Sequence, residues 1–389
     1  MRRQILVALL SLAFTAAVCF NARATEVTVT RTPNGGIQPQ VAVDSAGTVH
    51  LIYYKGKDGG GDVFYVRQKT GEREFSKPLQ VNSRASSAIA AGTIRGAQLA
   101  IGKNNRVHVI WNGGDGAEKA KVNGQDVTPL VYTRLNDAGT VFESERNLIT
   151  YAAGLDGGSS IAADGLGNVY AVWHGRAPDA VEGEEGRAVY ISRSTDEGKT
   201  FSPEAPATRE KTGACGCCGL RAFADQTGAV YILYRSALEM VNRDEILLAS
   251  PKPGAPFRIL NRHPWKIDGC PMSSASFSPD STGRAVAAWE TAGQVFFTDI
   301  DPKAMSIGKI ISPTGNVKRR HPVAVKNHKG ETLLGWSEGT GWAKGGAAVW
   351  QIFDAKGNPT LEQGRRDDLP VWDLVAAYVK PNGDFVVIY

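Results

Sequence analysis

The stretch DSAGTVHLIY, residues 44–53, joins a polar turn with glycine at its fourth position to an alternating apolar strand that ends on an aromatic residue. The same template, with small variations in the turn, occurs six more times along the 389-residue chain and always ends on Trp or Tyr. The further copies are GKNNRVHVIW (102–111), DGLGNVYAVW (164–173), DQTGAVYILY (225–234), DSTGRAVAAW (280–289), NHKGETLLGW (327–336) and KPNGDFVVIY (380–389). Seven copies of one unit predict an all-β fold, a single β-propeller of seven blades, with six blades as the alternative.

The spacing of the copies indicates what one blade contains. Successive copies begin 47 to 62 residues apart, which accommodates four short strands and their turns. The last copy ends at Tyr389 after two strands, whereas EVTVTR (26–31) precedes the first unit without a partner. We therefore expect the N-terminal strand to close the last blade, which gives 27 strands and leaves no open sheet edge. In the first unit the strands are expected at Gln38–Val43, Thr48–Tyr54, Val63–Gln68 and Pro78–Asn82.

The first 24 residues differ in character from the rest of the chain. A basic start, an apolar run over Ile5–Val18 and a small-x-small site at residues 22–24 predict a cleaved secretory signal peptide. The mature propeller domain is then 25–389, in the periplasm or secreted, and the Arg2-Arg3 pair leaves the twin-arginine route open. No later segment has the ~20 apolar residues of a spanning helix, so no membrane span is expected.

The charge balance excludes one class of partner. The chain has 44 basic and 39 acidic residues, and three of the arginines lie in the predicted signal peptide, so the mature chain carries a net charge of +2. No lysine-rich tract or basic helix is present, which argues against nucleic-acid binding. We expect a monomer that binds a small molecule, a glycan or a metal at one face of the propeller.

One turn resembles a motif of a known family. STDEGKTF (194–201) is similar to the Asp-box, or BNR repeat, of the sialidase superfamily, with the pattern Ser-x-Asp-x-Gly-x-Thr-aromatic, and LNDAGTVF (135–142) is a degraded second copy. The resemblance implies a sialidase-like propeller. In that family the Asp-box is a structural hairpin away from the ligand face, so it indicates the fold and says nothing about chemistry.

The ligand face should be the one that carries the loops leading into the innermost strands and the loops joining the second strand of each blade to the third. These loops hold charged and aromatic residues that depart from the repeat template. The candidate ligand-binding residues are His174, Arg176, Arg235, Arg320 and His321.

The sialidase resemblance also implies an alternative function, an exo-sialidase or related glycoside hydrolase. Sialidases hold the substrate carboxylate with three arginines and use a Tyr nucleophile with a Glu partner. The N-terminal Phe-Arg-Ile-Pro motif is missing, because Phe257–Leu260 (FRIL) lies mid-chain and lacks the proline. A binding module is therefore preferred over an active hydrolase, and a protein-interaction platform is a third reading. For the hydrolase, the candidate residues are Tyr234, Glu290, Arg95, Arg221, Arg235 and Arg319.

The stretch ACGCCGL (214–220) concentrates three cysteines, and Cys270 is the remaining one of the mature chain. Cys215 lies ten residues before the repeat that begins at Asp225, and Cys270 lies ten residues before the repeat at Asp280. Equivalent positions in successive blades are neighbours in space, so we expect all four cysteines, Cys215, Cys217, Cys218 and Cys270, to converge on the ligand face.

Two uses of such a cluster are open. In an oxidising compartment the thiols can form two disulfides, Cys215 with Cys217 or Cys218 and the remaining cysteine with Cys270. Closely spaced thiolates also suit a soft metal, Cu(I) or Zn, with copper as the expected cofactor. The string CGCC is similar to the cysteine motif of small periplasmic copper-resistance proteins.

Overall fold

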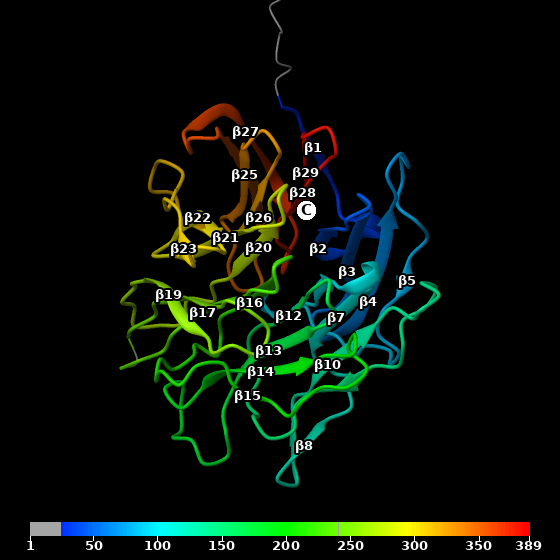
Figure 1. Ribbon diagram of the computed structural model, residues 1–389, viewed down its shortest axis with the longest axis vertical. Helices are drawn as coiled ribbons and strands as arrows, with labels where there is room; N and C mark the ends of the chain where they lie inside the picture. The colour runs from blue at the N-terminus through cyan, green and yellow to red at the C-terminus, as the bar shows by residue number, and fades with distance from the viewer. Residues whose placement is uncertain (1–24, 240) are drawn as a thin grey trace, which may run out of the picture.

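The computed structural model describes residues 25–239 and 241–389, so the predicted signal peptide at 1–24 lies outside the described residues. Seven blades surround a central channel (Figure 1), and six of them are four-stranded antiparallel sheets. Blade 1 consists of β2 (Ile37–Val43), β3 (Val49–Lys57), β4 (Gly60–Gln68) and β5 (Leu79–Gln80). Blade 2 consists of β6 (Gln98–Ile101), β7 (Val107–Asn112), β10 (Leu130–Arg134) and β11 (Arg146–Asn147). Blade 3 consists of β12 (Ser159–Ala163), β13 (Val169–Gly175), β14 (Ala188–Ser194) and β15 (Ala205–Pro206).

The second half of the chain repeats this order. Blade 4 consists of β16 (Arg221–Ala224), β17 (Val230–Arg235), β18 (Glu245–Ser250) and β19 (Arg258–His263). Blade 5 consists of β20 (Ala275–Pro279), β21 (Ala285–Thr291), β22 (Gln294–Asp301) and β23 (Ser306–Ile307). Blade 6 consists of β24 (Arg319–Lys326), β25 (Thr332–Glu338), β26 (Gly346–Phe353) and β27 (Pro359–Leu369). Two 3-10 turns, η1 (Pro33–Gly35) and η2 (Lys103–Asn105), complete the described elements together with blade 7 and one hairpin.

Blade 7 is closed by the N-terminal strand, as predicted. It has three strands, β28 (Ala376–Val379), β29 (Phe385–Ile388) and β1 (Val27–Thr30), with β1 parallel to β29 and Val27 opposite Phe385 (Figure 1). The Thr32 amide also donates to the Tyr389 carbonyl at 2.8 Å. Among the described residues the blades hold the expected 27 strands, so the seven-blade prediction is confirmed and the six-blade alternative is wrong.

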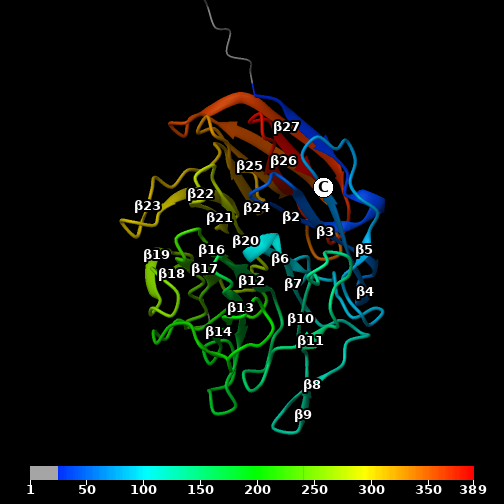
Figure 2. The ribbon, with the colours of Figure 1, turned by 45° about the vertical axis from the view of Figure 1, so that its right-hand side comes forward.

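One element was not expected. The loop between β7 and β10 carries a small hairpin, β8 (Ala120–Val122) with β9 (Gln125–Val127), that projects from blade 2 (Figure 2). The strands expected in the first unit appear close to their predicted bounds, although β3 and β4 extend to a tight turn in which Lys57 pairs with Gly60. The outer strand β5 is shorter than expected, with two residues.

The hydrophobic core lies between adjacent blades. Trp111 and Trp173 end two copies of the repeat, and both are completely buried. Trp173 packs with Tyr190 of its own blade and with Ile110 and Tyr132 of blade 2, so each interface is filled from both sides. Burying one such aromatic side chain contributes about 1.5–3 kcal/mol, which explains why the repeat template ends on Trp or Tyr.

The turn at 194–201 is held by its own side chains. The Asp196 carboxylate accepts from the Thr200 amide at 2.9 Å and from the Ser194 hydroxyl at 2.7 Å. The Ser194 oxygen in turn accepts from the Gly198 amide at 2.8 Å, with Gly198 at φ +79°. Because β14 and β15 are joined at this turn, it lies at the end of blade 3 away from the loop that leads into the innermost strand β12.

No helix within 25–239 or 241–389 has the length and apolar character needed to span a membrane.

Candidate functional site

The cysteine loop, defined as residues 214–220, leads into β16 and is held by three blades. The Cys215 amide donates to the Arg235 carbonyl at 2.9 Å, and the Gly219 amide donates to the Ser273 carbonyl at 2.9 Å. From blade 3, the Gly157 amide donates to the Gly216 carbonyl at 2.6 Å. A Cβ at Gly157 would lie 2.5 Å from the Cys218 carbonyl oxygen, so only glycine permits this approach.

The four cysteines converge, as predicted from the repeat. Cys217 forms a disulfide with Cys270 across 53 residues of sequence, while Cys215 and Cys218 are buried thiols. The Cys215 Sγ lies 3.4 Å from the Cys217 Sγ and 3.3 Å from the Cys218 Sγ. The sulfur atoms of the three loop cysteines all lie within 4.8 Å of one another. One of the two expected disulfides is therefore present, and the remaining pair, Cys215 and Cys218, is reduced.

The two free thiols have opposite acidities. Burial disfavours the Cys218 thiolate, but the hydrogen bond with Cys215 and the charge of Arg235 outweigh burial and lower the pKa of Cys218 to about 6. The Ser273 hydroxyl adds a contact to its sulfur at 3.5 Å. The hydrogen bond with Cys218, together with burial, raises the pKa of Cys215 well above its ordinary value. The two shifts have opposite directions, so ionisation of the pair is favoured at Cys218 over Cys215.

Arg235 supplies the positive charge beneath the cysteine loop. Its guanidinium pairs with the Glu245 carboxylate at 2.9 Å, and its Nε donates to the Ser273 hydroxyl at 2.6 Å. Its other nitrogens donate to the carbonyl oxygens of Arg243 and Glu290, and the Trp265 ring lies 4.8 Å from its central carbon. These buried acceptors occupy the donors of Arg235, one of the candidate ligand-binding residues.

Buried carboxylates surround this arginine. Burial raises the pKa of Glu245 to about 8, although the Arg235 charge opposes the rise. Burial also raises the pKa of Glu290 to about 7 against the charges of Arg320 and Arg235. Arg320 lies 3.6 Å from Glu290 through its Nε and donates to the Pro271 carbonyl at 2.5 Å. Arg320 therefore contacts both the Glu290 carboxylate and the loop that contains Cys270.

The other candidate ligand residues differ in their burial and in their contacts. His174 is buried below the cysteine loop, with Nε2 at 3.2 Å from the Cys218 carbonyl and no partner for Nδ1 in the described part of the chain. Burial lowers the pKa of His174 to about 4, so the ring is neutral at pH 7. The Arg176 amide donates to the Ala153 carbonyl at 2.7 Å, and the residue is partly exposed. His321 contacts the Ser274 hydroxyl at 3.0 Å through Nδ1 and faces the channel.

The residues named for a hydrolase do not form one constellation. Tyr234 lies in β17 on the side opposite Arg235, and its hydroxyl lies 2.8 Å from the Thr212 hydroxyl within the interface to blade 3. Glu290 instead belongs to the Arg320 and Arg235 group described above. The expected pairing of Tyr234 with Glu290 is thus not observed, because alternation along the strand turns Tyr234 away.

The arginines of that set also have separate surroundings. Arg95 pairs with Asp156 at 2.6 Å, and Arg319 donates to Gln294 and to the Thr314 carbonyl of its own loop. Arg221 points into the central channel. The expected three-arginine clamp is not assembled, because Arg95 and Arg319 are each bound to carboxylate or carbonyl groups close to their own positions.

Several site residues were missed by the sequence reasoning. Glu245 stands directly opposite Arg235 in the pairing of β18 with β17, so the register of the two strands was the signal that would have found it. Ser273 follows Cys270 closely in the same loop and had no distinguishing pattern. Trp342, 62 % exposed, lies edge-on to Trp372 with ring centroids 4.8 Å apart, and its exposure is visible only in the folded structure.

Comparison with known proteins gives the class of the fold. No protein-family model and no curated protein matches the chain. Among solved structures it is similar to the Hadza microbial sialidase Hz136, at 12 % identity over 83 % of this chain and 66 % of that chain, with a TM-score of 0.51. It is also similar to an ulvan lyase of polysaccharide lyase family PL25, at 11 % identity over 89 % and 87 % of the two chains and a TM-score of 0.51. The Dos1 propeller matches at 12 % identity over 90 % and 78 %, with a TM-score of 0.50.

These likenesses establish the fold alone. The chain is an all-β, seven-bladed propeller of the sialidase-like kind, and it spans slightly less than two thirds of the Hadza sialidase. Its chemistry has to be argued from its own residues.

Proposed function

We propose that the protein is an exported binding module that holds a soft metal ion, Cu(I), in a cysteine cluster made of Cys215, Cys217, Cys218 and Cys270. The observation that carries the proposal is the position of three Sγ atoms within 4.8 Å of one another on the ligand face. Thiolate is the donor that Cu(I) prefers over the oxygen ligands chosen by hard cations, and convergent thiolates can hold one ion or bridge several.

The charges around the cluster suit a monovalent ion. Two thiolates with one Cu(I) carry a net charge of −1, and the Arg235 guanidinium next to Cys218 offsets it. Arg235 itself is held by Glu245 at 2.9 Å. Burial of the loop restricts water and competing ligands at the sulfur atoms.

The disulfide determines how many sulfur ligands are available. With Cys217 bonded to Cys270, two thiols remain, Cys215 and Cys218. Reduction of that bond frees two more sulfurs next to them, so metal capacity should depend on the redox state. The signal-peptide pattern and the likeness of CGCC to periplasmic copper-resistance proteins support an exported copper-binding role.

A competition experiment tests the proposal. The mature chain is reduced under anaerobic conditions and titrated into a Cu(I)–bicinchoninate complex, whose absorbance falls as the protein removes copper. We expect the reduced protein to take up Cu(I), and the disulfide-bonded protein to take up less. Cys270→Ser should weaken uptake while the far-ultraviolet circular dichroism stays that of a propeller.

The matched control replaces all four cysteines of the cluster by serine. Serine keeps the size of the side chain and removes the soft donor, so residual uptake by surface histidines is measured directly. A reduced wild-type protein that competes no better than this four-serine variant would show that the cluster is a structural brace and that the copper proposal is wrong.

A further inference from the structure

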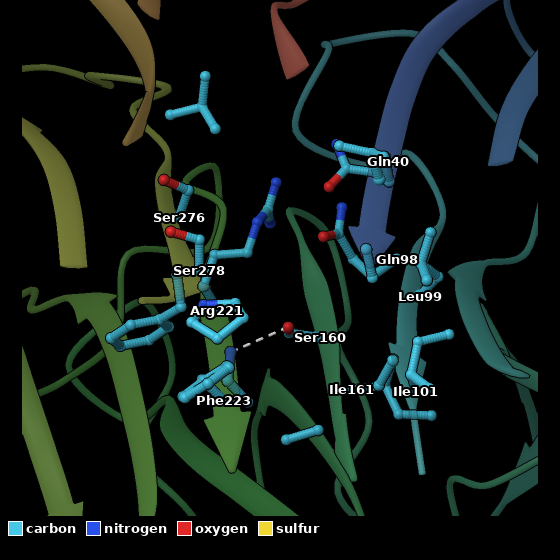
Figure 3. A pocket seen from close by; sticks show the side chains of 18 of the residues that line it. Gln40, Gln98, Leu99, Ile101, Ser160, Ile161, Arg221, Phe223, Ser276 and Ser278 are labelled. Atoms are coloured by element: carbon cyan, nitrogen blue, oxygen red, sulfur yellow. Dashed lines mark hydrogen bonds between the residues drawn. The ribbon is translucent and has the colours of Figure 1, made fainter. Parts of the chain in front are cut away.

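The central channel contains a second polar site, separate from the cysteine cluster. A cavity of about 290 Å³ is lined by the innermost strands of all seven blades. Figure 3 shows Arg221 extending from β16 into this cavity, with the side-chain amides of Gln40 and Gln98 across from its guanidinium. Ser276 from β20 lies on the same wall as Arg221.

Arg221 is a buried cation with no acidic partner. The residue is 7 % exposed, and its Nη1 donates to the carbonyl of its own neighbour Leu220 at 2.8 Å. Within 25–239 and 241–389, no carboxylate forms an ion pair with it. Burial lowers the pKa of Arg221 to about 10, with no opposing charge, so the group stays ionised at neutral pH.

Other buried or partly buried arginines of this propeller have a carboxylate beside them. Arg95 pairs with Asp156, and Arg235 pairs with Glu245. Arg320 lies beside Glu290. A buried charge that lacks such a partner is unfavourable unless another group supplies the counter-charge, so Arg221 favours binding of an anion beside it in the channel.

The neighbouring side chains can donate hydrogen bonds, and the Gln98 amide already donates one to the Gly96 carbonyl at 3.4 Å. The Ser276 hydroxyl is buried and has no hydrogen-bond partner in the described part of the chain. The amides of Gln40 and Gln98 can each donate through their NH₂ groups. His321 also lines the channel. Burial lowers its pKa to about 3, so its ring is neutral at pH 7.

The acidic residues that line the channel are already engaged. Asp225 accepts from the Thr227 amide at 2.8 Å and the Ala229 amide at 3.0 Å, and these bonds hold it in the turn that follows β16. Asp164 has the same role in the turn after β12, where it accepts from the Asn168 amide at 2.9 Å. Arg221 is the first residue of β16, and Ser160 is the second residue of β12. Each turn lies at the opposite end of its strand from these residues. Neither acid therefore supplies the counter-charge.

We infer that the channel binds a small oxyanion, held by the Arg221 guanidinium with donors from Gln40, Gln98 and Ser276. The chemistry is that of a carboxylate or an inorganic oxyanion such as phosphate, for which the planar, forked guanidinium is the suited cation. The cavity volume exceeds a single ion, so a carboxylate that belongs to a small organic molecule also fits. The inference does not depend on copper, since none of these residues belongs to the cysteine cluster.

Ligand-observed fluorine NMR tests the inference. Trifluoroacetate is the probe, and trifluoroethanol is the uncharged analogue of similar size. The wild-type protein should broaden the trifluoroacetate signal and leave the trifluoroethanol signal sharp. Arg221→Met should weaken trifluoroacetate binding by about tenfold or more, because charge-assisted hydrogen bonds are lost. Arg258→Met, which removes an exposed charge on the outer strand β19, should bind like the wild type.

Competition identifies the source of the anion. Displacement of the probe by inorganic phosphate indicates an inorganic oxyanion, and displacement by acetate alone indicates an organic carboxylate; either result supports the site. Equal broadening by the wild type and Arg221→Met, or equal broadening of trifluoroethanol, would refute it. If Arg221→Met does not fold, Ser276→Ala serves the same comparison, since it removes one donor and leaves the charge in place.

Discussion

The hairpin at 194–201 and the cysteine loop at 214–220 are close in sequence but are held in opposite ways. In the hairpin, the Asp196 carboxylate is bound by Ser194 and Thr200, two and four residues away. In the cysteine loop, the Cys217 sulfur is bonded across 53 residues and the Cys218 sulfur is contacted by Ser273 across 55. The aspartate of the hairpin is held by residues of the same turn, whereas two sulfurs of the cysteine loop have partners in the loop that precedes blade 5.

The difference shows where this propeller places its buried charged and titratable groups. The hairpin is partly exposed, and it faces away from the channel. The cysteine loop is buried together with Arg235, Glu245 and Glu290, which are all charged or titratable. Buried charges are stable only when several groups are placed together, so such groups collect where loops of different blades meet.

The largest expected effect is at Arg235. Arg235→Met leaves Glu245 buried without its cation and removes donors from the carbonyls of Arg243 and Glu290. The free energy of unfolding should fall by about 3–5 kcal/mol, because several buried acceptors lose the donors that Arg235 supplies. Urea unfolding measures this loss, with Arg258→Met on the exposed outer strand as the control. A loss below about 1 kcal/mol would mean that the cysteine loop does not depend on this arginine.

The disulfide is the next test of the same dependence. Replacing Cys217 and Cys270 together by serine removes a cross-link across 53 residues and should lower the free energy of unfolding by about 2–4 kcal/mol. Cys215→Ser with Cys218→Ser keeps the cross-link and should cost less in the same urea titration. Equal losses in the two double variants would show that the bond is not what ties blade 4 to blade 5.

A substitution in the hairpin should have a smaller effect that stays local. Asp196→Ala removes the acceptor for Thr200 and Ser194, and the free energy of unfolding should fall by about 1–2 kcal/mol. Copper uptake by the reduced protein should be unchanged, because the cysteine cluster lies at the other end of the blades. A variant that loses copper uptake as well would remove the contrast between the two regions.

The last comparison concerns two aspartates with opposite pKa shifts. Burial raises the pKa of Asp373, in the loop before β28, to about 7, although the amides of Gln38 and Leu374 donate to it. A carboxyl whose folded-state pKa is raised stabilises the fold below its ordinary pKa near 3.8, and that contribution is lost as the pH rises through 7. Asp373→Asn keeps the acceptor oxygen, so its melting temperature should exceed that of the wild type at pH 8 and not at pH 4.

The hairpin aspartate should show the reverse dependence. Burial opposes ionisation of Asp196, but hydrogen bonds from Thr200 and Ser194 outweigh it and lower its pKa to about 2. Its contribution is therefore present above pH 4 and lost as the pH falls toward 2. The difference in melting temperature between the wild type and Asp196→Ala, measured from pH 7 to pH 2, should shrink. A constant difference across that range would contradict the assignment.

The sequence alone determined the features that depend on periodicity. The seven repeats predicted the blades, the unpartnered strand at 26–31 predicted the closure of blade 7, and the equal offsets of Cys215 and Cys270 predicted that the cysteines meet. Alternation along a strand and the offset between repeats are properties of the chain itself, so they can be read without coordinates.

The tertiary structure decided which groups became partners. It placed Tyr234 and Arg235 on opposite sides of β17, paired Arg235 with Glu245, and gave Arg221 no carboxylate partner among the described residues. It also chose Cys217 as the partner of Cys270. These outcomes depend on which side chains of separate blades reach the same point and which acceptors are nearest there. Burial then sets how strongly each charge depends on its partner. Neither the identity of the partner nor the degree of burial can be read from the order of the residues.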